Sequence, residues 1–355
     1  MTASRDPPAL TRVTGSSLIA WAWVPCVMAA LAYPHLLAVF HNQLNSVDGS
    51  LGLAVGALIL AFGVSALGLL GAFVSGRSDV QRPRVRMARR ISHLVTAAPP
   101  LFVFMGVLLF LMRVEGMDVA VWTALWLAVA AATLMQQFAE PGDGHAASVG
   151  PSVPRRRNAV LRVMHGVTAV AILVVFLGPH LGNHLSALWG DEVHHRVMDM
   201  LRVVYRNGLV EPLLIGIIGL QVISGLVLWR PKIAVRADFL GTLQTASGIY
   251  LAAFLLAHVN SVFTLARYFG TDTNWAWATS APNGLTADPW DVRLIPHYAL
   301  GVFLLLAHLC CAVRAVMIAH GVPVARANRR TWGLLGLGVL LSAAIASAML
   351  GWRIV

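Results

Sequence analysis

Residues 162–185 have the sequence RVMHGVTAVAILVVFLGPHLGNHL, an apolar run that contains three histidines, His165, His180 and His184. The run is long enough to cross a bilayer, which takes a helix of about 20 residues. A bare imidazole in hydrocarbon is unfavourable, so an ionisable side chain at membrane depth suggests a functional site. A neutral imidazole that binds a metal or a haem iron avoids this cost. The stretch therefore predicts a membrane helix that offers a ligand to such a centre.

The composition of the whole chain is typical of a membrane protein. Of its 355 residues, 58% are hydrophobic and only 12% are charged, and the mean hydropathy is +0.73. A water-soluble protein of this length needs more charge on its surface. The apolar residues form long runs and not the alternating segments of a β-barrel. We therefore expect an all-α polytopic membrane protein.

Nine apolar runs are long enough to cross the membrane as helices. Each holds about 20 residues or more, enough for about 30 Å at about 1.5 Å per residue. We place them at residues 17–40, 51–75, 93–113, 117–139, 160–185, 209–229, 242–267, 295–317 and 331–353. The polar, Gly- and Pro-rich stretch 141–158 is typical of a linker. It would divide a four-helix region, 1–140, from a five-helix region, 159–355.

Basic residues set the predicted orientation. The net charge is +11, and Lys232 is the single lysine among 26 Lys and Arg residues. With nine spans, 19 of the 26 fall on the side of the N-terminus and seven on the other. Positive loops stay in the cytoplasm, so we expect a cytoplasmic N-terminus and an external C-terminus in the cell (inner) membrane. The basic residues set the orientation of the chain in the membrane and do not indicate nucleic-acid binding.

Two of the loops on the external side are long. Residues 186–208 carry apolar side chains at helical spacing, which predicts a short helix lying on the outer surface. Residues 268–294 hold Trp275, Trp277 and Trp290 among Gly, Pro and Asp, and predict an irregular cap with interfacial anchors. His194 and His195, in the first of these loops, indicate a metal only weakly, because two ligands are too few.

A weak internal repeat links the two regions. ARRISHLVTAAPPLFVF (88–104) is similar to VLRVMHGVTAVAILVVF (160–176), and AYPHLLAVFH (32–41) is similar to LGPHLGNHL (177–185). Repeated helix hairpins are common in membrane proteins, so the first region would be a degenerate copy of the second. The alternative is that the constraints shared by all membrane helices produce these short similarities.

Two histidines fall at a similar depth on parallel spans. His180 and His258 lie in the outer halves of spans that both run from inside to outside. Bis-histidine ligation of a b-type haem needs such a pair, one ring nitrogen on each face of the porphyrin. His308 lies in the inner half of its span, where a second haem would require another histidine. The comparable level of the sixth span holds Gln221, a poor iron ligand.

Residues 160–350 resemble the five-helix, di-haem cytochrome b membrane anchor of succinate dehydrogenases and fumarate reductases. The third of four segments is the most specific, because it places a histidine ten residues after Q-x-x-(S/T)-G. The segments are MHGVTAVAILVVFLGPHLGNHL, VMDMLRVVYRNGLVEPLLIGIIGLQVISGLVLW, LQTASGIYLAAFLLAHVNSV and IPHYALGVFLLLAHLCCAVRAV. The first four spans lie outside the resemblance.

The resemblance implies haem ligands. Histidines matching His180 and His258 hold the haem nearer the outer face, and one matching His308 holds the inner haem. The position of its partner falls here on Gln221, so one haem b is expected and a second would need a substitute ligand such as His165 or His93.

The resemblance also implies partners. The family's anchor fixes flavoprotein and iron–sulfur subunits to the cytoplasmic face and passes electrons to quinone. This chain has no G-x-G-x-x-G and no cysteine set, so it would be a non-catalytic electron-transfer subunit. Glu211 is the carboxylate placed for proton exchange at a quinone site, although a first-turn residue favoured by the helix dipole is the alternative. A second hypothesis is a membrane redox sensor or scaffold that keeps the fold without turnover.

Overall fold

The computed structural model describes residues 18–77, 82–139 and 155–354, and this part of the chain is helical with no strand. Eight helices are long and apolar enough to cross a membrane, and a bent pair of shorter helices brings the number to nine. The prediction of an all-α polytopic membrane protein is therefore confirmed.

The first region contains α2 (Trp23–Asn45), α3 (Leu51–Arg77), the bent pair α4 (Pro83–Thr96) and α5 (Ala98–Leu111), and α6 (Asp118–Ala139). The pair α4 and α5 is bent by 64°. The bend falls at Ala97, just before Pro99 and Pro100, which donate no backbone hydrogen bond and clash with the carbonyl groups of the preceding turn. The predicted third span, 93–113, is thus the second half of a longer bent crossing.

The second region contains five spans and several short elements. The fifth crossing is built from α7 (Arg155–Ile172), the π-helical turn η1 (Leu173–Leu177) and α8 (Gly178–Ser186), followed by η2 (Ala187–Trp189) and α9 (Asp191–Tyr205). The remaining elements are α10 (Val210–Lys232), α11 (Phe239–Phe263), the π turn η3 (Thr264–Tyr268), α12 (Trp275–Ala278), η4 (Asp291–Arg293), α13 (Leu294–Ala319) and α14 (Val324–Met349). Most of the predicted linker lies outside the described residues, and its last four residues are the first turn of α7.

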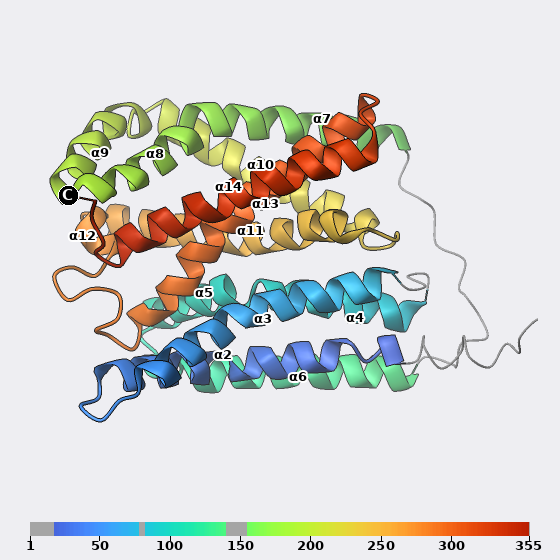
Figure 1. Ribbon diagram of the computed structural model, residues 1–355, viewed down its shortest axis with the longest axis horizontal. Helices are drawn as coiled ribbons and strands as arrows, with labels where there is room; N and C mark the ends of the chain where they lie inside the picture. Colours follow the sequence, from blue (N-terminus) through green and yellow to red (C-terminus); the bar gives the residue numbers. More distant parts are fainter. Residues whose placement is uncertain (1–17, 78–81, 140–154, 355) are drawn as a thin grey trace, which may run out of the picture.

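Successive spans run in opposite directions along the bundle. Figure 1 shows α8, α9, α12 and the C-terminus gathered at one end (left). We call it the histidine-rich end, because α8, α9, the second half of α11 and the start of α13 carry His180, His184, His194, His258 and His297. The opposite end holds the start of α4 and α7 and the end of α10; we call it the arginine-rich end, after Arg77, Arg86, Arg89, Arg90, Arg230, Arg329 and Arg330. The predicted helix in 186–208 is confirmed as α9.

The two predicted regions share one core. The helix α11 packs against α3, α4 and α5 of the first region and against α10 and α13 of the second. The apolar core contains buried residues from both, among them Phe102, Leu181 and Ile345. In Figure 1, α13 crosses the bundle obliquely, from the layer of α2 to α6 towards the start of α14.

The start of α13 is held in the first region by a buried arginine. Arg293 forms an ion pair with Asp118 at the start of α6, at 2.6 Å. Its guanidinium also lies over the ring of Phe102, 4.4 Å from the centroid, and over Trp290. A buried cation needs such a partner, because desolvation of an unpaired charge is costly. This contact fixes the angle at which α13 enters the bundle.

Candidate functional site

The spans that carry His180 and His258 both contain a π-helical turn. The turn η1 stands directly before the sequence Gly178-Pro179-His180, and η3 directly follows α11, which carries His258. Pro179 cannot donate a helical hydrogen bond and its ring crowds the preceding turn, which accounts for the wider turn at η1. Single π turns within α-helices are frequent at functional sites.

The structure brings the side chains of His180 and His258 together. Their ring centroids are 6.3 Å apart, and the rings are inclined by 63°. A metal–imidazole bond is about 2 Å long, so two imidazoles on opposite sides of one metal have ring centres about 6 Å apart. The separation therefore fits a pair of axial ligands. Each ring also stacks on an aromatic neighbour, His180 on Phe176 and His258 on Phe254.

His180 also faces His184, one turn further along α8. Their Nε2 atoms are 3.2 Å apart, so one of them carries the proton that the other accepts. A ligand bond from His180 would replace this contact. Within the described residues, no group of three or more His, Cys, Asp or Glu side chains is placed to hold a metal ion. A haem needs only two protein ligands, because the porphyrin supplies the other four.

A second layer of aromatic and imidazole rings extends from His184 to α9. The ring of His184 stacks on that of His194, at 5.7 Å, and Trp275 of α12 lies against both. Asn183 donates to Nε2 of His194 at 3.2 Å, if that nitrogen is the acceptor. Burial lowers the pKa of His194 to about 4. The charge of Asp191 opposes this shift, and the charges of His195, Arg202 and Arg353 add to it. His194 is therefore neutral at pH 7.

Two expectations for the loops are corrected by this layer. His194 is not a polar loop residue, because only 2% of it is exposed, whereas its neighbour His195 is exposed and contacts Asp199. Trp275 is not an interfacial anchor but a buried core residue. The sequence did carry one signal for His194: it lies four residues before the buried Met198, on the same face of α9.

Glu211 at the start of α10 is ion-paired with Arg267 of η3. The carboxylate is thus tied to the turn that follows the His258 helix. It lies at the histidine-rich end, as the sequence predicted, but its role in proton exchange stays a prediction.

At the opposite level of the bundle, His165 contacts Ser224 and Gln221. Its Nδ1 is 2.8 Å from Ser224 Oγ, and its Nε2 is 3.3 Å from Gln221 Nε2. Thr168 donates to Gln221 Oε1 at 2.6 Å, which orients the amide so that its NH₂ group faces the imidazole. Both ring nitrogens of His165 are therefore already partnered by protein groups.

His308 of α13 has a different environment. Its Nδ1 is 3.0 Å from the carbonyl oxygen of Gln244 and 3.2 Å from Ser247 Oγ. A carbonyl only accepts, so Nδ1 carries the proton and Nε2 keeps its lone pair. Histidines that bind metals are commonly held in this way by a backbone carbonyl. Gly248 allows the close approach, since a Cβ there would lie 3.2 Å from Cε1 of His308.

In the internal repeat, His93 corresponds to His165 and His35 to His180. Their surroundings differ from those of these counterparts. His93 is fully buried and hydrogen-bonded, with Nδ1 donating to the carbonyl of Arg89 at 2.8 Å. Its Nε2 is 3.1 Å from Thr245 Oγ1. His35 is exposed on α2. Neither faces the pair His180 and His258.

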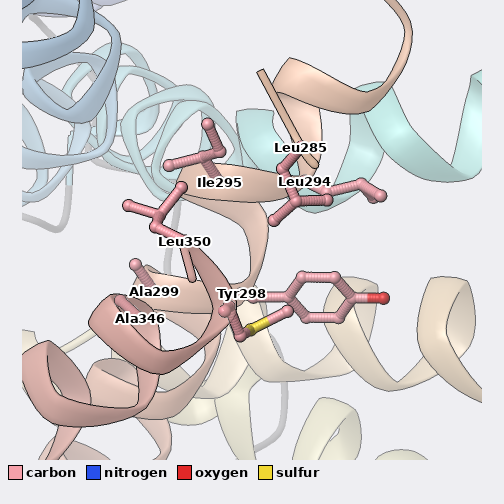
Figure 2. A pocket seen from close by; sticks show the side chains of 8 residues that line it. Leu285, Leu294, Ile295, Tyr298, Ala299, Ala346 and Leu350 are labelled. Atoms are coloured by element: carbon pink, nitrogen blue, oxygen red, sulfur yellow. The ribbon is translucent and has the colours of Figure 1, made fainter. Parts of the chain in front are cut away.

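An apolar hollow lies between α13 and α14 near His258. It is small, with a volume of about 10 Å³, about what one water molecule needs, and its lining is Leu285, Leu294, Ile295, Tyr298, Ala299, Ala346, Met349 and Leu350. Tyr298 is the polar member of this lining, and its ring lies 6.1 Å from that of His258. Figure 2 shows the tyrosine hydroxyl pointing away from Ala299 and Leu350. The hollow therefore has room for a water molecule and not for a ring in this arrangement of side chains.

No protein family model, no curated protein and no solved structure matches this chain.

Proposed function

We propose that this chain is an integral-membrane haem b protein that carries electrons to or from a quinone, in the manner of the membrane anchor of succinate dehydrogenases and fumarate reductases. His180 and His258 would be its axial ligands and metal contacts. The observation that supports this most is the 6.3 Å separation of two imidazole rings from separate membrane spans.

When bound, a haem b supplies reversible one-electron chemistry. The residues around the pair would shape that site. Phe176 and Phe254 stack on the two imidazoles and restrict their rotation. Tyr298, whose ring lies 6.1 Å from that of His258, is the candidate hydrogen-bond donor to a quinone near the pair. Glu211 is the candidate for proton exchange, after release of its ion pair with Arg267.

We propose one haem. His308 donates from Nδ1, which leaves Nε2 as its ligand atom, but the partner position that the resemblance implies is Gln221, which contacts His165. A second haem would need His165 as the other ligand, and His165 would first have to give up its contacts with Ser224 and Gln221.

The orientation follows from charge. The arginine-rich end would face the cytoplasm, with the N-terminus inside and the C-terminus outside the cell (inner) membrane. Flavoprotein and iron–sulfur subunits, if the chain has them as partners, would dock there, and lipid would cover the sides of the bundle.

The second candidate function is a membrane redox sensor or scaffold without turnover. Two observations favour it. Gln221 contacts a ring nitrogen of His165, which is then not free as a ligand, and α2 to α6 add a region that the anchor family lacks. A haem that is reduced chemically but not by quinol would support this alternative.

The test is a reduced-minus-oxidised spectrum of the purified full-length protein, supplied with haem during expression. We expect the α-band of a bis-histidine b haem in the wild type, and its loss in His258→Ala. The matched control is His195→Ala, an exposed histidine of α9, which should keep the band. A wild-type protein without the band overturns the proposal.

A further inference from the structure

The two regions of the chain meet at the arginine-rich end along a seam between α4 and the end of α10. The ring of His93 on α4 lies 6.0 Å from the ring of Trp229 on α10. Arg89 Nη1 donates to the carbonyl oxygens of Ile233, at 2.9 Å, and Val235, at 2.6 Å. Arg89 itself is fully buried. The seam is therefore a fixed contact between the regions.

Three arginines line this seam outside the buried contact. Arg86 and Arg90 lie one turn apart on α4, and Arg230 follows Trp229 on α10. Arg90 is close enough to both of the others for their charges to repel. In the described part of the chain, none of the three has a carboxylate partner.

Other arginines of the bundle are paired with acids. Arg202, Arg267, Arg293, Arg314 and Arg353 each form an ion pair with an aspartate or a glutamate. Three like charges held together without an acid are unfavourable unless an anion from outside joins them. The seam also contains buried donors that no protein group accepts: Nε and Nη2 of Arg89 and Nε1 of Trp229.

The surface next to the seam indicates what kind of anion fits. Ile223 and Val227 precede Arg230 by seven and three residues, so they continue its face of α10 towards the middle of the membrane. They are exposed by 64% and 49%, respectively. An apolar stripe that ends in unpaired arginines matches an acyl chain that ends in a phosphate. The planar guanidinium groups suit phosphate oxygens, which they can bind in a bidentate manner.

We propose that the seam formed by Arg86, Arg90 and Arg230 binds the phosphate of an anionic phospholipid, whose acyl chain lies along Ile223 and Val227. The lipid would join the two regions of the chain at the arginine-rich end. This site lies away from His180 and His258 and does not depend on their function.

The test uses native mass spectrometry and thermal unfolding of the full-length protein in detergent, titrated with phosphatidylglycerol, phosphatidylcholine or inorganic phosphate. We expect retention of phosphatidylglycerol over phosphatidylcholine and no stabilisation by inorganic phosphate. The variant R86Q/R90Q should bind phosphatidylglycerol about tenfold more weakly or worse, since each basic residue near the surface contributes about 1 kcal/mol.

The matched control is R329Q/R330Q, which removes the same charge from two exposed arginines of α14 at the same end. It should bind phosphatidylglycerol within about twofold of the wild type, because these two arginines lie on α14 and outside the seam. Equal weakening in both double variants overturns the proposal, since it means general attraction to a positive surface. Stabilisation by inorganic phosphate alone also overturns it. If R86Q/R90Q does not fold, the exposed residue Arg230 is changed instead, and Arg230→Gln should also weaken the binding of phosphatidylglycerol.

Discussion

His180 and His258, 78 residues apart in the chain, place their imidazole rings 6.3 Å from each other across two membrane spans. The contact depends on the wide turn before Pro179, because one residue more or less per turn rotates every later side chain about the helix axis. His184 lies within hydrogen-bonding distance of the same ring. Three imidazoles therefore converge, and two are enough to hold a haem.

Substitutions of His180 and His184 can show which of these two neighbours on α8 is the haem ligand. We predict that His184→Leu keeps at least half of the b-haem α-band, whereas His180→Leu abolishes it, because only His180 pairs with His258. Reduced-minus-oxidised spectra of equal amounts of protein measure this. The reverse pattern would assign the ligand to His184.

Loss of the buried charge of Arg293 should be strongly destabilising. Arg293→Met leaves Asp118 without its partner, and we predict a loss of about 3 kcal/mol in the free energy of unfolding. Adding Asp118→Leu should recover part of this loss, because the unpaired charge is then gone. Thermal unfolding of the single and double variants in one detergent measures the coupling; additive losses would contradict the prediction.

The pKa of His194 predicts how stability depends on pH. An unfolded histidine titrates near pH 6.5, whereas His194 in the fold has a pKa of about 4. Between these values the unfolded chain binds the extra proton, so stability should fall as the pH falls from about 6.5 to about 4 and be unaffected by this group above that window. The loss is up to about 3 kcal/mol.

The measurement is the unfolding temperature between pH 7.5 and 4.5. His194→Gln should flatten the profile in this window, whereas the exposed neighbour changed in His195→Gln should leave it as in the wild type. Identical profiles for all three proteins would show that His194 is not buried as a neutral ring.

Close packing of α3 on α4 leaves no room for a side chain at Gly68. A Cβ at Gly68 would lie 2.5 Å from the backbone nitrogen of Thr96, so we predict that Gly68→Ala costs about 1–3 kcal/mol through overpacking. At Gly63 of the same helix nothing lies within 4 Å, and Gly63→Ala should be neutral or stabilise by about 1 kcal/mol. Unfolding temperatures of the two variants test this directly.

Much of the fold could be predicted because a membrane span is a local property. Residues such as 51–75 or 209–229 are apolar over the length of a bilayer whatever their neighbours do, so their helices were placed within a few residues. The bend at Ala97 was not predicted, although Pro99 and Pro100 were its signal. The helix α9 was expected from its apolar spacing, but not which of its faces is buried.

Part of the candidate site could likewise be predicted from the sequence, and part could not. The spacing along the chain was enough to predict that His180 and His258 lie at one level of the bundle, since depth follows from position along a span. Which side chains meet at each level came from the packing of the helices: His184, His194 and Trp275 near the pair, and Gln221 against His165 at the opposite level. The physical reason is that the rotation of each helix about its own axis is set by packing against distant segments, such as the contact of Arg293 with Asp118, and no local pattern records it.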